Sequence, residues 1–483
     1  MKKLLFATAI LAVLLACSKG ESAETQPTDP EKEEAVRTLS DVNAKADALK
    51  AEILNSASET AITAGTVYYV SNGGNDTNSG KSAKTAWASL SKVSLADLKS
   101  GDLVLFERDG SWRGNLKAKA GVTYSAYGSG DKPKIIGSLQ NYSIRDKWKA
   151  TGTPNVYVYD QVFSNDAGVL VFNEGEFYTT KKVIGIDGFT GDISQLKNDL
   201  EMYHGITDKK IYLYSGNGNP ADRFPSIEFC LKEHIIRLEG DHVAIDNLCL
   251  KFGGAHGISS GSRNGLKVTN CELGWIGGSI QRETTRYGNA VEIYGACSDY
   301  VVDHCYIYQI YDAGVTHQYK NYTSSQPVIM ENVRYSNNLI EYCSYSIEYF
   351  LDQPLSEGDV MRNISFTNNI CRFAGYGFGW QRPNKVARHI QAGWLGGKRK
   401  YPAENFRIEG NIFDRSVDVL LSVSALKEGH LPKMENNIYI QTAGKNFGMV
   451  GVEYTRYYPF DSKIGALIKE KGIDGNPTII FAE

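Results

Sequence analysis

Three acidic side chains, Glu292, Asp312 and Glu348, lie beside short alternating apolar runs in the second half of the chain. Counting ten residues back from Val302 reaches Glu292, and counting ten forward from Asn338 reaches Glu348, which places both glutamates in one column of a repeated unit. Two carboxyl groups in one site push each other's pKa values apart. One can then donate a proton while the other activates water, which is the chemistry of acid–base glycoside hydrolysis.

Asp312 stands just before this column, at the corner "YDAG", and is interpreted as the third catalytic carboxyl. A corner cap is the alternative for Asp312, and bonding to a loop backbone is the alternative for each of the three acids. His317 and Gln318 follow and are candidate substrate-binding residues, with an inward-pointing His317 left open.

The units that carry these acids are repeats of an apolar-x-polar-polar pattern, 23 to 42 residues apart. Each unit continues with a second alternating strand and a small-residue corner, and it contains no stretch of helical period. Glycine is abundant (48) and proline scarce (13), which suits tight corners and unbroken ladders. We therefore predict an all-β fold, a single-stranded right-handed parallel β-helix of about 22 residues per turn. The repeats start at Ile245, Val268, Val302, Tyr335, Phe366, Ile408 and Met434.

The polar pair of each unit, such as Asn337-Asn338 or Asn368-Asn369, is expected at a bend, where each amide bonds the copy one rung away. Strands in such a coil are about 4.8 Å apart. Glu292 and Glu348, two rungs apart, would then be separated by roughly 10 Å at the backbone. Val315 would lie between them, or Thr316 if the register shifts by one. Side-chain tilt can bring the carboxyls within the ~6.5–9.5 Å that inverting glycosidases use.

Longer rungs carry inserts at about 278–289, 318–329, 350–361 and 380–403, predicted to bulge at one phase of the coil. Loops stacked in this way wall a groove beside the strand face. Aromatic and amide side chains in them suit sugar rings, which have apolar faces and hydroxyl edges. The candidate substrate-binding residues of the inserts are Arg286, Tyr287, Trp380, Arg382 and His389.

The last insert is basic. From Trp380 to Lys400 it has six Lys or Arg residues, His389 and no acid. Such a run suits carboxylate or sulfate groups of a glycan, with arginine forks favouring carboxylates. It is compatible with hydrolysis and also with elimination, in which a base removes the proton next to a neutralised carboxylate.

The first 17 residues, "MKKLLFATAILAVLLAC", have the basic start and apolar stretch of a secretory signal. "LLAC" resembles the bacterial lipobox, which implies cleavage before Cys17 and lipidation of that cysteine. The apolar stretch is too short to cross a bilayer comfortably. We expect an exported protein, lipid-anchored to a bacterial membrane, on the periplasmic or cell-surface side of the outer membrane.

Residues 18–63 are rich in charge and poor in aromatics, which predicts a flexible and partly helical tether. Residues 64–483 show no dividing linker and are predicted to form one β-helix domain. The net charge of −3 argues against nucleic acid as a partner. Seven cysteines besides Cys17, with no CxxC spacing, indicate buried thiols without a zinc site. No cofactor or metal is expected, and the protein is expected to be a monomer.

Several stretches of the sequence resemble a known group of proteins. "YYVSNGGNDTNSGKSAKTAWASLSKV", "GDLVLFERDGSWRG" and "GVTYSAYGSGDKPKIIGS" resemble the N-terminal region of secreted bacterial β-helix proteins of the pectate-lyase-like superfamily. "RYGNAVEIY" and "IYDAGVTHQ" resemble a largely uncharacterised group within it. The resemblance covers roughly residues 65–450 and implies the right-handed parallel β-helix. It does not imply one reaction, because the superfamily holds lyases, hydrolases, epimerases and non-enzymatic spikes, and it leaves calcium open, which many pectate lyases use.

"GGAHGISSGS" resembles the Gly-His-Gly motif of polygalacturonases, but the flanking rungs "HVAIDNLCLKF" and "NGLKVTNCELG" lack that family's carboxylates. His256 is therefore interpreted as a corner residue or groove lining. The expected function is carboxylate-assisted, inverting hydrolysis of a complex acidic glycan. The alternatives are a polysaccharide lyase acting on a uronic-acid glycan, and a non-catalytic glycan-binding surface protein.

Overall fold

The computed structural model of the chain describes residues 30–57, 65–320, 326–352, 358–392, 403–424, 428–451 and 457–482. Cys17 and the signal segment lie outside the described residues, as does the end of the basic run, from residue 393 to Lys400.

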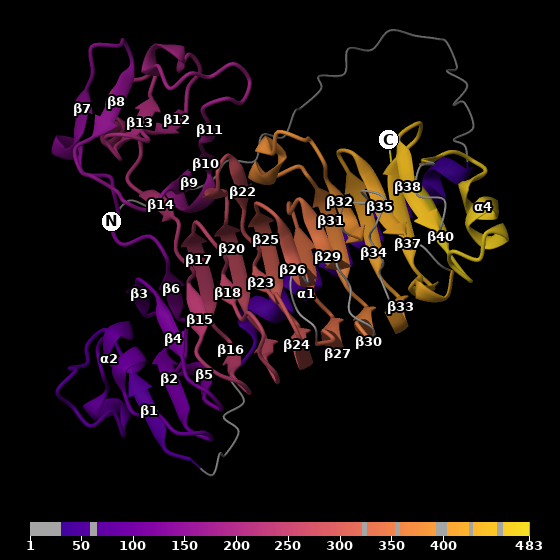
Figure 1. The fold of residues 1–483 in the computed structure, drawn as a ribbon, viewed down its shortest axis with the longest axis horizontal. Coiled ribbons are helices and arrows are strands. Elements are labelled where there is room, and N and C mark those ends of the chain that lie inside the picture. The colour runs from indigo at the N-terminus through magenta and orange to yellow at the C-terminus, as the bar shows by residue number, and fades with distance from the viewer. Residues whose placement is uncertain are drawn as a thin grey trace, which may run out of the picture.

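The chain winds into a coil in which each turn contributes one strand to each of three sheets, called A, B and C (Figure 1). Over the described residues each sheet has ten strands, and the pairs within the coil are parallel apart from the last strand of sheet C. This is the predicted right-handed parallel β-helix.

The strands of sheet A are β1 (Val67–Val70), β2 (Leu103–Glu107), β5 (Thr123–Tyr127), β16 (Ala244–Asp246), β19 (Lys267–Thr269), β24 (Cys297–Asp303), β27 (Ile329–Ser336), β30 (Val360–Thr367), β33 (Ala403–Glu409) and β36 (Lys433–Glu435). The strands of sheet B are β3 (Ser111–Arg113), β6 (Lys134–Ile136), β17 (Cys249–Gly253), β20 (Glu272–Ile276), β25 (Tyr306–Ile310), β28 (Leu339–Glu341), β31 (Ile370–Ala374), β34 (Ile412–Ser416), β37 (Ile438–Thr442) and β40 (Thr478–Ala482). The strands of sheet C are β4 (Leu116–Ala118), β15 (Ile236–Leu238), β18 (Ile258–Ser259), β23 (Val291–Glu292), β26 (Ala313–Lys320), β29 (Tyr345–Asp352), β32 (Arg388–Ala392), β35 (Val419–Ser424), β38 (Asn446–Gly451) and β39 (Tyr458–Pro459).

The predicted alignment of the repeats is confirmed by the register of sheet A. Each repeat start pairs with the next: Ile245 with Val268, Val268 with Val302, and so on through Tyr335, Phe366, Ile408 and Met434. All of these side chains point into the coil and are buried. Alternate residues of a strand share a face, so the apolar repeat starts form one continuous column inside the coil.

The second residue of each polar pair forms an internal ladder, as predicted. Asn338 Nδ2 donates to Asn369 Oδ1 (2.9 Å), Asn369 Nδ2 donates to Asn411 Oδ1 (3.0 Å), and Asn411 Nδ2 donates to Asn437 Oδ1 (3.0 Å). All four side chains are fully buried. The first residue of the pair turns the corner, since Asn368 has φ of 56°, a left-handed backbone that asparagine tolerates well.

Between β6 and β15 the chain leaves the coil and forms a subdomain over residues 139–233, which stands beside β17–β22 in Figure 1. Tyr142, Trp148 and Phe229 lie in its aromatic core. The sequence analysis assigned this range to the coil. Its elements are a five-stranded sheet of β7 (Trp148–Ala150), β8 (Val156–Tyr159), β13 (Ile211–Tyr214), β12 (Glu201–His204) and β11 (Thr180–Lys182), a three-stranded sheet of β9 (Ala167–Phe172), β10 (Phe177–Tyr178) and β14 (Ile227–Leu231), the helix α3 (Pro220–Arg223), and the 3₁₀ turns η2 (Arg145–Lys147), η3 (Asn173–Gly175) and η4 (Ile193–Gln195).

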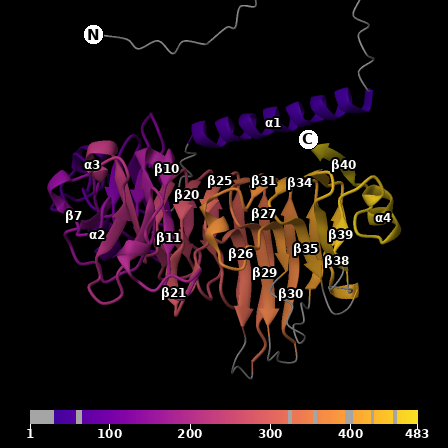
Figure 2. The same ribbon diagram turned by 90° about the horizontal axis from the view of Figure 1, so that it is seen from above.

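The helix α1 (Pro30–Asn55) runs along the outside of sheet B (Figure 2). Its apolar side packs Val42, Ala46 and Ile53 against the outward side chains of sheet B, among them Leu339 and Ile370. The sequence analysis placed this stretch in a tether. Shorter elements complete the fold: η1 (Ala83–Thr85) and α2 (Leu90–Leu95) near the start of the coil, η5 (Phe378–Gln381) and η6 (Glu428–His430) at its corners, and α4 (Ile464–Glu470) near its end.

Within the described residues, no helix has both the length and the apolar character needed to cross a membrane. The seven cysteines from Cys230 to Cys371 are free and buried, as predicted. Burial raises the pKa of each of six of them, including Cys305 inside the coil. They therefore behave as small apolar side chains.

Candidate functional site

The two predicted glutamates share one column on the outer face of sheet C. Val291 pairs with Val315, which sets Glu292 beside Thr316, and Thr316 pairs with Glu348. The residue between the glutamates is therefore Thr316, one position beyond the Val315 that the repeat count first reaches. Val315 itself points into the coil and is fully buried. Two rungs at about 4.8 Å place the glutamate backbones roughly 10 Å apart.

Glu292 lies among polar side chains at the start of this column and is 8% exposed. Ser259 Oγ donates to its Oε2 at 3.0 Å, and Nε2 of His256 lies 3.9 Å from its Oε1. The backbone N–H of Asn289 donates to Nδ1 of His256 at 3.0 Å. Because Nδ1 accepts, the ring presents Nε2–H to Glu292. His256 thus lines the site, one of its two predicted roles, but the sequence analysis gave it no contact with Glu292.

Asp312 and Arg382, 70 residues apart, form an ion pair at the edge of sheet C next to the glutamate column. Asp312 is 6% exposed. The guanidinium carbon of Arg382 lies 5.8 Å from the ring centre of Tyr311 and 5.3 Å from that of Tyr345. Burial, the largest single effect, lowers the pKa of Arg382, but the charge of Asp312 together with smaller contributions from Tyr345, Tyr311 and Glu348 outweighs it, and the pKa lies above its usual range. The guanidinium predicted to bind substrate is thus engaged by a carboxylate.

The charges of the carboxylates affect the pKa values of two nearby tyrosine hydroxyls. Burial raises the pKa of Tyr287, and the charges of Glu292 and Asp312 raise it further. Burial likewise raises the pKa of Tyr345 to about 12, with Arg382 opposing the rise and Glu348 adding to it. Both phenols are therefore neutral hydrogen-bond donors at neutral pH. Sequence reasoning missed Tyr345, because its place beside Asp312 depends on pairing between two rungs.

Tyr287 is held in place by the hairpin of β21 (Ser279–Arg282) and β22 (Thr285–Tyr287). The neck of this hairpin needs glycine: a Cβ on Gly288 would lie 2.3 Å from the Cα of Gly277. Arg286, on the same strand, is 5% exposed and donates to the carbonyls of Gly278 (2.6 Å) and Gly168 (3.1 Å). It braces the hairpin against the subdomain.

The inserts lie at two corners of the coil, which corrects the prediction of a single phase. The hairpin and the segment that contains η5 connect sheet B to sheet C. The inserts after β26, β29 and β32 connect sheet C to sheet A, and their central parts lie outside the described residues. Sheet C is consequently flanked by inserts along both edges.

Two of the predicted substrate-binding histidines, His317 and His389, lie inside the coil, which for His317 is the alternative that the sequence left open. His317 is fully buried between the rings of Tyr335 and Tyr349, with centroids 5.9 and 5.6 Å away. Strand alternation turns it inward with Val315, and burial lowers its pKa to about 3. His389 is also fully buried, with Nδ1 3.0 Å from Ser346 Oγ, and burial lowers its pKa to about 4.

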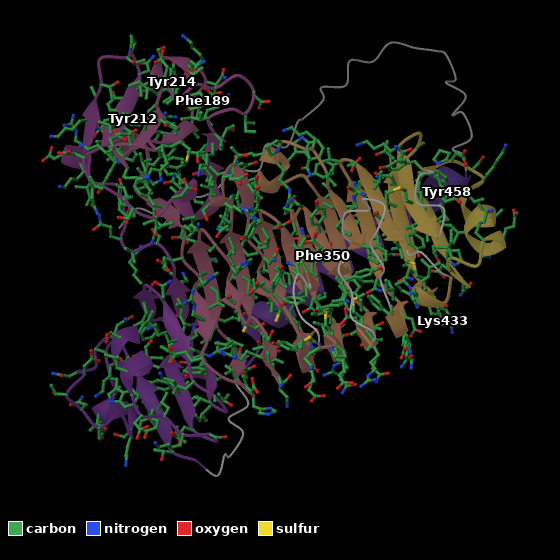
Figure 3. The ribbon with its side chains drawn as sticks, viewed as in Figure 1. Phe189, Tyr212, Tyr214, Phe350, Lys433 and Tyr458 are labelled. Atoms are coloured by element: carbon green, nitrogen blue, oxygen red, sulfur yellow. The ribbon has the colours of Figure 1, made fainter. Side chains whose placement is uncertain are left out.

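Gln318 points to the outer face two residues beyond the Thr316 position and is 9% exposed. Its strand neighbours are Phe350, which Figure 3 labels on the coil, and Tyr294. Its Oε1 is buried and accepts no hydrogen bond from the described residues. Over the same residues, no group of three or more His, Cys, Asp or Glu side chains is placed to hold a metal ion.

No protein-family model matches this chain, and no curated protein matches it. Three solved structures are similar to it at a low level. XylC, solved with xylose, is 13% identical over 80% of this chain and 70% of its own, with a TM-score of 0.43. A glycoside hydrolase is 11% identical over 81% and 90%, with a TM-score of 0.45. An alginate lyase from Paenibacillus sp. str. FPU-7 is 12% identical over 73% and 85%, with a TM-score of 0.35. Likeness at this level gives no activity to this chain.

Proposed function

We propose that this protein is a carbohydrate-active enzyme that hydrolyses a glycan with carboxylate assistance on the outer face of sheet C. The observation that carries the proposal is the shared column of Glu292 and Glu348, with Thr316 between them. Three further polar side chains lie near this column: Asp312, Tyr287 and Tyr345. They are not part of a ladder that repeats from rung to rung. The motifs that resemble the pectate-lyase-like superfamily agree with a glycan substrate.

One glutamate protonates the leaving oxygen and the other activates water, in either order. A backbone separation of roughly 10 Å allows the carboxyl groups to approach within the ~6.5–9.5 Å that leaves room for water. This spacing favours inversion of the anomeric centre. Asp312, held by Arg382, is the third carboxyl of the site, and the two tyrosine hydroxyls donate hydrogen bonds to sugar oxygens.

The test is a pair of isosteric changes, Glu292→Gln and Glu348→Gln, assayed on a panel of acidic and neutral glycans for new reducing ends. Each should keep the fold and lose about 10²–10⁴-fold in turnover, because glutamine cannot exchange a proton. Glu283→Gln, on the exposed tip of the hairpin, is the matched control and should turn over normally. Near-normal rates in both glutamine variants would overturn the hydrolase proposal.

Elimination on a uronic-acid glycan is the second candidate. It needs a cation to neutralise the substrate carboxylate and a base beside the reacting carbon. His389 cannot serve as that base from inside the coil, and Arg382 is engaged by Asp312, so this reaction has less support. Absorbance of unsaturated uronates in the same assay would identify it. Retention on a glycan without any product would favour the third candidate, a non-catalytic binding protein.

We further propose that the protein is exported and held at a bacterial membrane by lipid on Cys17, which the lipobox-like "LLAC" supports. The change Cys17→Ser should move the protein from the membrane fraction to the soluble fraction without loss of activity. A variant that still sediments with membranes would overturn this proposal.

A further inference from the structure

A polar cavity lies between η5 and the subdomain, and none of the three predicted catalytic carboxylates lines it. It has a volume of about 460 Å³, which falls in the range of small-molecule sites. Tyr376 and Trp380 on one wall and Lys182 on the other line it, together with Arg286. The hydrolysis proposed at the carboxylate column assigns no role to this cavity.

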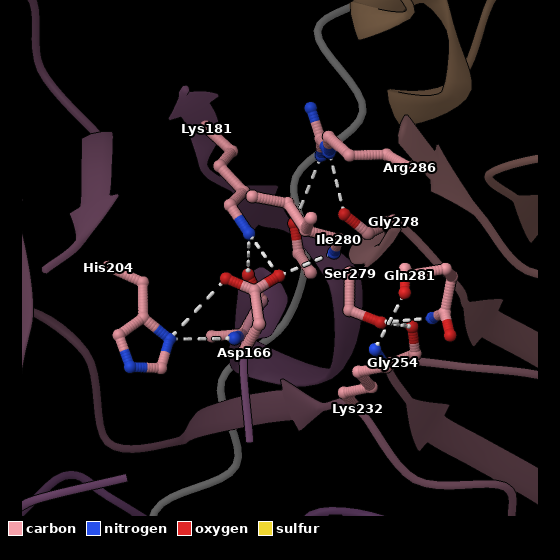
Figure 4. A network of polar contacts seen from close by, with 12 residues as sticks. Asp166, Lys181, His204, Lys232, Gly254, Gly278, Ser279, Ile280, Gln281 and Arg286 are labelled. Atoms are coloured by element: carbon pink, nitrogen blue, oxygen red, sulfur yellow. Dashed lines mark hydrogen bonds and ion pairs between the residues drawn. The ribbon is translucent and has the colours of Figure 1, made fainter. Parts of the chain in front are cut away.

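The charges of this cavity are unbalanced. Lys181 is paired with Asp166, as Figure 4 shows, and Lys182 is paired with Glu201 at 2.9 Å. Arg286 and Lys385 have no carboxylate within ion-pair distance among the described residues. Arg286 donates only to the backbone carbonyls of Gly278 and Gly168 (Figure 4).

Of these two cations, Arg286 is the stronger evidence for an anion site, because it is only 5% exposed. Burying a cation without an ion-pair partner is costly. Burial lowers the pKa of Arg286, although Tyr311 and the more distant charge of Asp166 partly oppose the shift. Asp187 is an acid in the lining, but it is exposed on the rim. An anion that entered the cavity would supply the missing counter-charge.

One wall of the cavity suits a sugar ring. Trp380 is partly exposed there, and the ammonium of Lys385 lies 5.5 Å from its ring centre and donates to its carbonyl at 2.8 Å. A pyranose that stacked on the indole would place an exocyclic anionic group beside this ammonium. Tyr376, 46% exposed, offers a second aromatic surface on the same wall.

The cavity is preformed. Gln381 Oε1 accepts from the backbone N–H of Lys181 at 3.1 Å, and Gln381 Nε2 donates to the carbonyl of Thr179 at 2.8 Å. This two-point clamp fastens η5 to the edge strand β11 of the subdomain. Across the hairpin, the Asp166 carboxylate accepts from the backbone N–H of Ile280 at 2.6 Å (Figure 4). A rigid site loses little freedom when it binds a ligand.

The cavity and the carboxylate site share a wall. The guanidinium carbons of Arg286 and Arg382 lie 4.5 and 5.8 Å from the ring centre of the same residue, Tyr311. The two guanidinium groups are therefore at most about 10 Å apart. This distance is compatible with one oligosaccharide that contacts both sites.

We propose that this cavity is an anion-selective sugar subsite, which holds a ring bearing a carboxylate or a sulfate while the next glycosidic bond lies at the carboxylate column. The cavity's role as a subsite rests on the proposed function; its selectivity for anionic sugars does not. The shared chemistry of the two ligands is an exocyclic oxyanion held between Arg286 and Lys385 over Trp380.

The experiment measures binding of four monosaccharides, glucuronate, galacturonate, glucose 6-sulfate and glucose, to the intact protein by saturation-transfer NMR titration. At least one of the anionic sugars should bind, more weakly at higher salt, and glucose should not. Lys385→Gln should weaken that binding about tenfold and Lys385→Glu more than that. Lys433→Gln, on a lysine paired with Glu435 in sheet A, is the control and should change nothing (Figure 3).

Comparison of the uronates with the sulfate ester identifies which anion the site prefers. Equal binding of glucose and the charged sugars, no binding of any of them, or no effect of either Lys385 variant would overturn the proposal. Because no bond is cleaved, the result is independent of the catalytic assignment. If the anionic sugars bind but the Glu292→Gln and Glu348→Gln variants turn over normally, the hydrolase proposal is wrong and the anion-selective sugar site is still supported.

Discussion

Nε2 of His256 lies 3.9 Å from Oε1 of Glu292, and the N–H that Asn289 donates to Nδ1 turns the Nε2–H toward that carboxylate. We therefore expect the imidazole to act as a positioning residue for Glu292. A loss of this contact should affect the chemistry more than the fold, since His256 belongs to a corner and lies outside the apolar interior.

We expect His256→Leu to lower kcat about 10-fold to 100-fold, which corresponds to about 1.4–2.8 kcal/mol, with little change in KM. The carboxylate would keep its bond from Ser259 but lose its second polar neighbour. The pH profile of kcat should shift with it, whereas a merely structural role would leave the profile in place. An unchanged kcat and pH profile in a folded variant would contradict the positioning role.

Arg382→Ala should destabilise the protein, because it leaves the buried carboxylate of Asp312 without its partner. Breaking a buried pair from one side costs about 3–5 kcal/mol, measurable as a lower urea midpoint. The double variant Asp312→Asn with Arg382→Met should recover part of that loss, since neither group is then charged. Equal stability of the single and double variants would show that the pair does not hold this edge of the sheet.

Asn369→Leu should destabilise the coil, because the Asn369 amide accepts from Asn338 and donates to Asn411 and to the Tyr335 carbonyl. Each buried group left unpaired costs about 1–3 kcal/mol. Thermal unfolding of the variant should show a lower Tm than the wild type, with Asn384→Leu on an exposed loop as the control. A Tm equal to that of the control would mean that the ladder adds little to stability.

His317→Phe should protect the fold against acid. The pKa of His317 is about 3 in the folded protein because the ring is buried, against about 6.5 in an unfolded chain. The unfolded state therefore binds more protons between those values, and stability falls by about 1.4 kcal/mol per pH unit as the pH drops below about 6.5. Phenylalanine keeps the stacking on Tyr335 and Tyr349 and removes this proton.

Urea midpoints measured at pH 7.5 and pH 5.5 check this prediction. The wild type should lose stability between the two pH values through His317 and the other histidines with a lowered pKa, which are His389 (pKa about 4), His234 (about 3) and His204. The His317→Phe variant should lose about 1.4 kcal/mol less over this interval. An equal loss in both proteins would contradict the neutral, buried state of His317.

Much of the coil could be predicted from sequence because its determinants are local. An apolar alternation and a polar pair recur in each rung, and parallel pairing brings equal positions side by side. The alignment from Ile245 to Met434 and the ladder through Asn338 and Asn369 follow from this alone. The column of Glu292 and Glu348 follows as well, apart from the single-residue choice between Val315 and Thr316.

The sequence holds no comparable signal for the subdomain of residues 139–233 or for the site of α1. The subdomain has no repeat from which to count, and its strands pair with one another outside the coil. The helix α1 is visible as an amphipathic segment, but its partner is a row of outward side chains such as Leu339 and Ile370, which exists only once successive rungs stack.

By itself, then, the sequence determined the repeating backbone, the buried ladder and the columns on each face, because these depend on the alternation of side chains within one rung. Only the tertiary structure decided which side chains meet across rungs and inserts. Asp312 reaches Arg382, His256 reaches Glu292, and Trp380 faces the subdomain, because insert length and the path of each corner set these distances. The inward turn of His317 likewise depended on the register of one strand, since a shift of one residue exchanges its inner and outer faces.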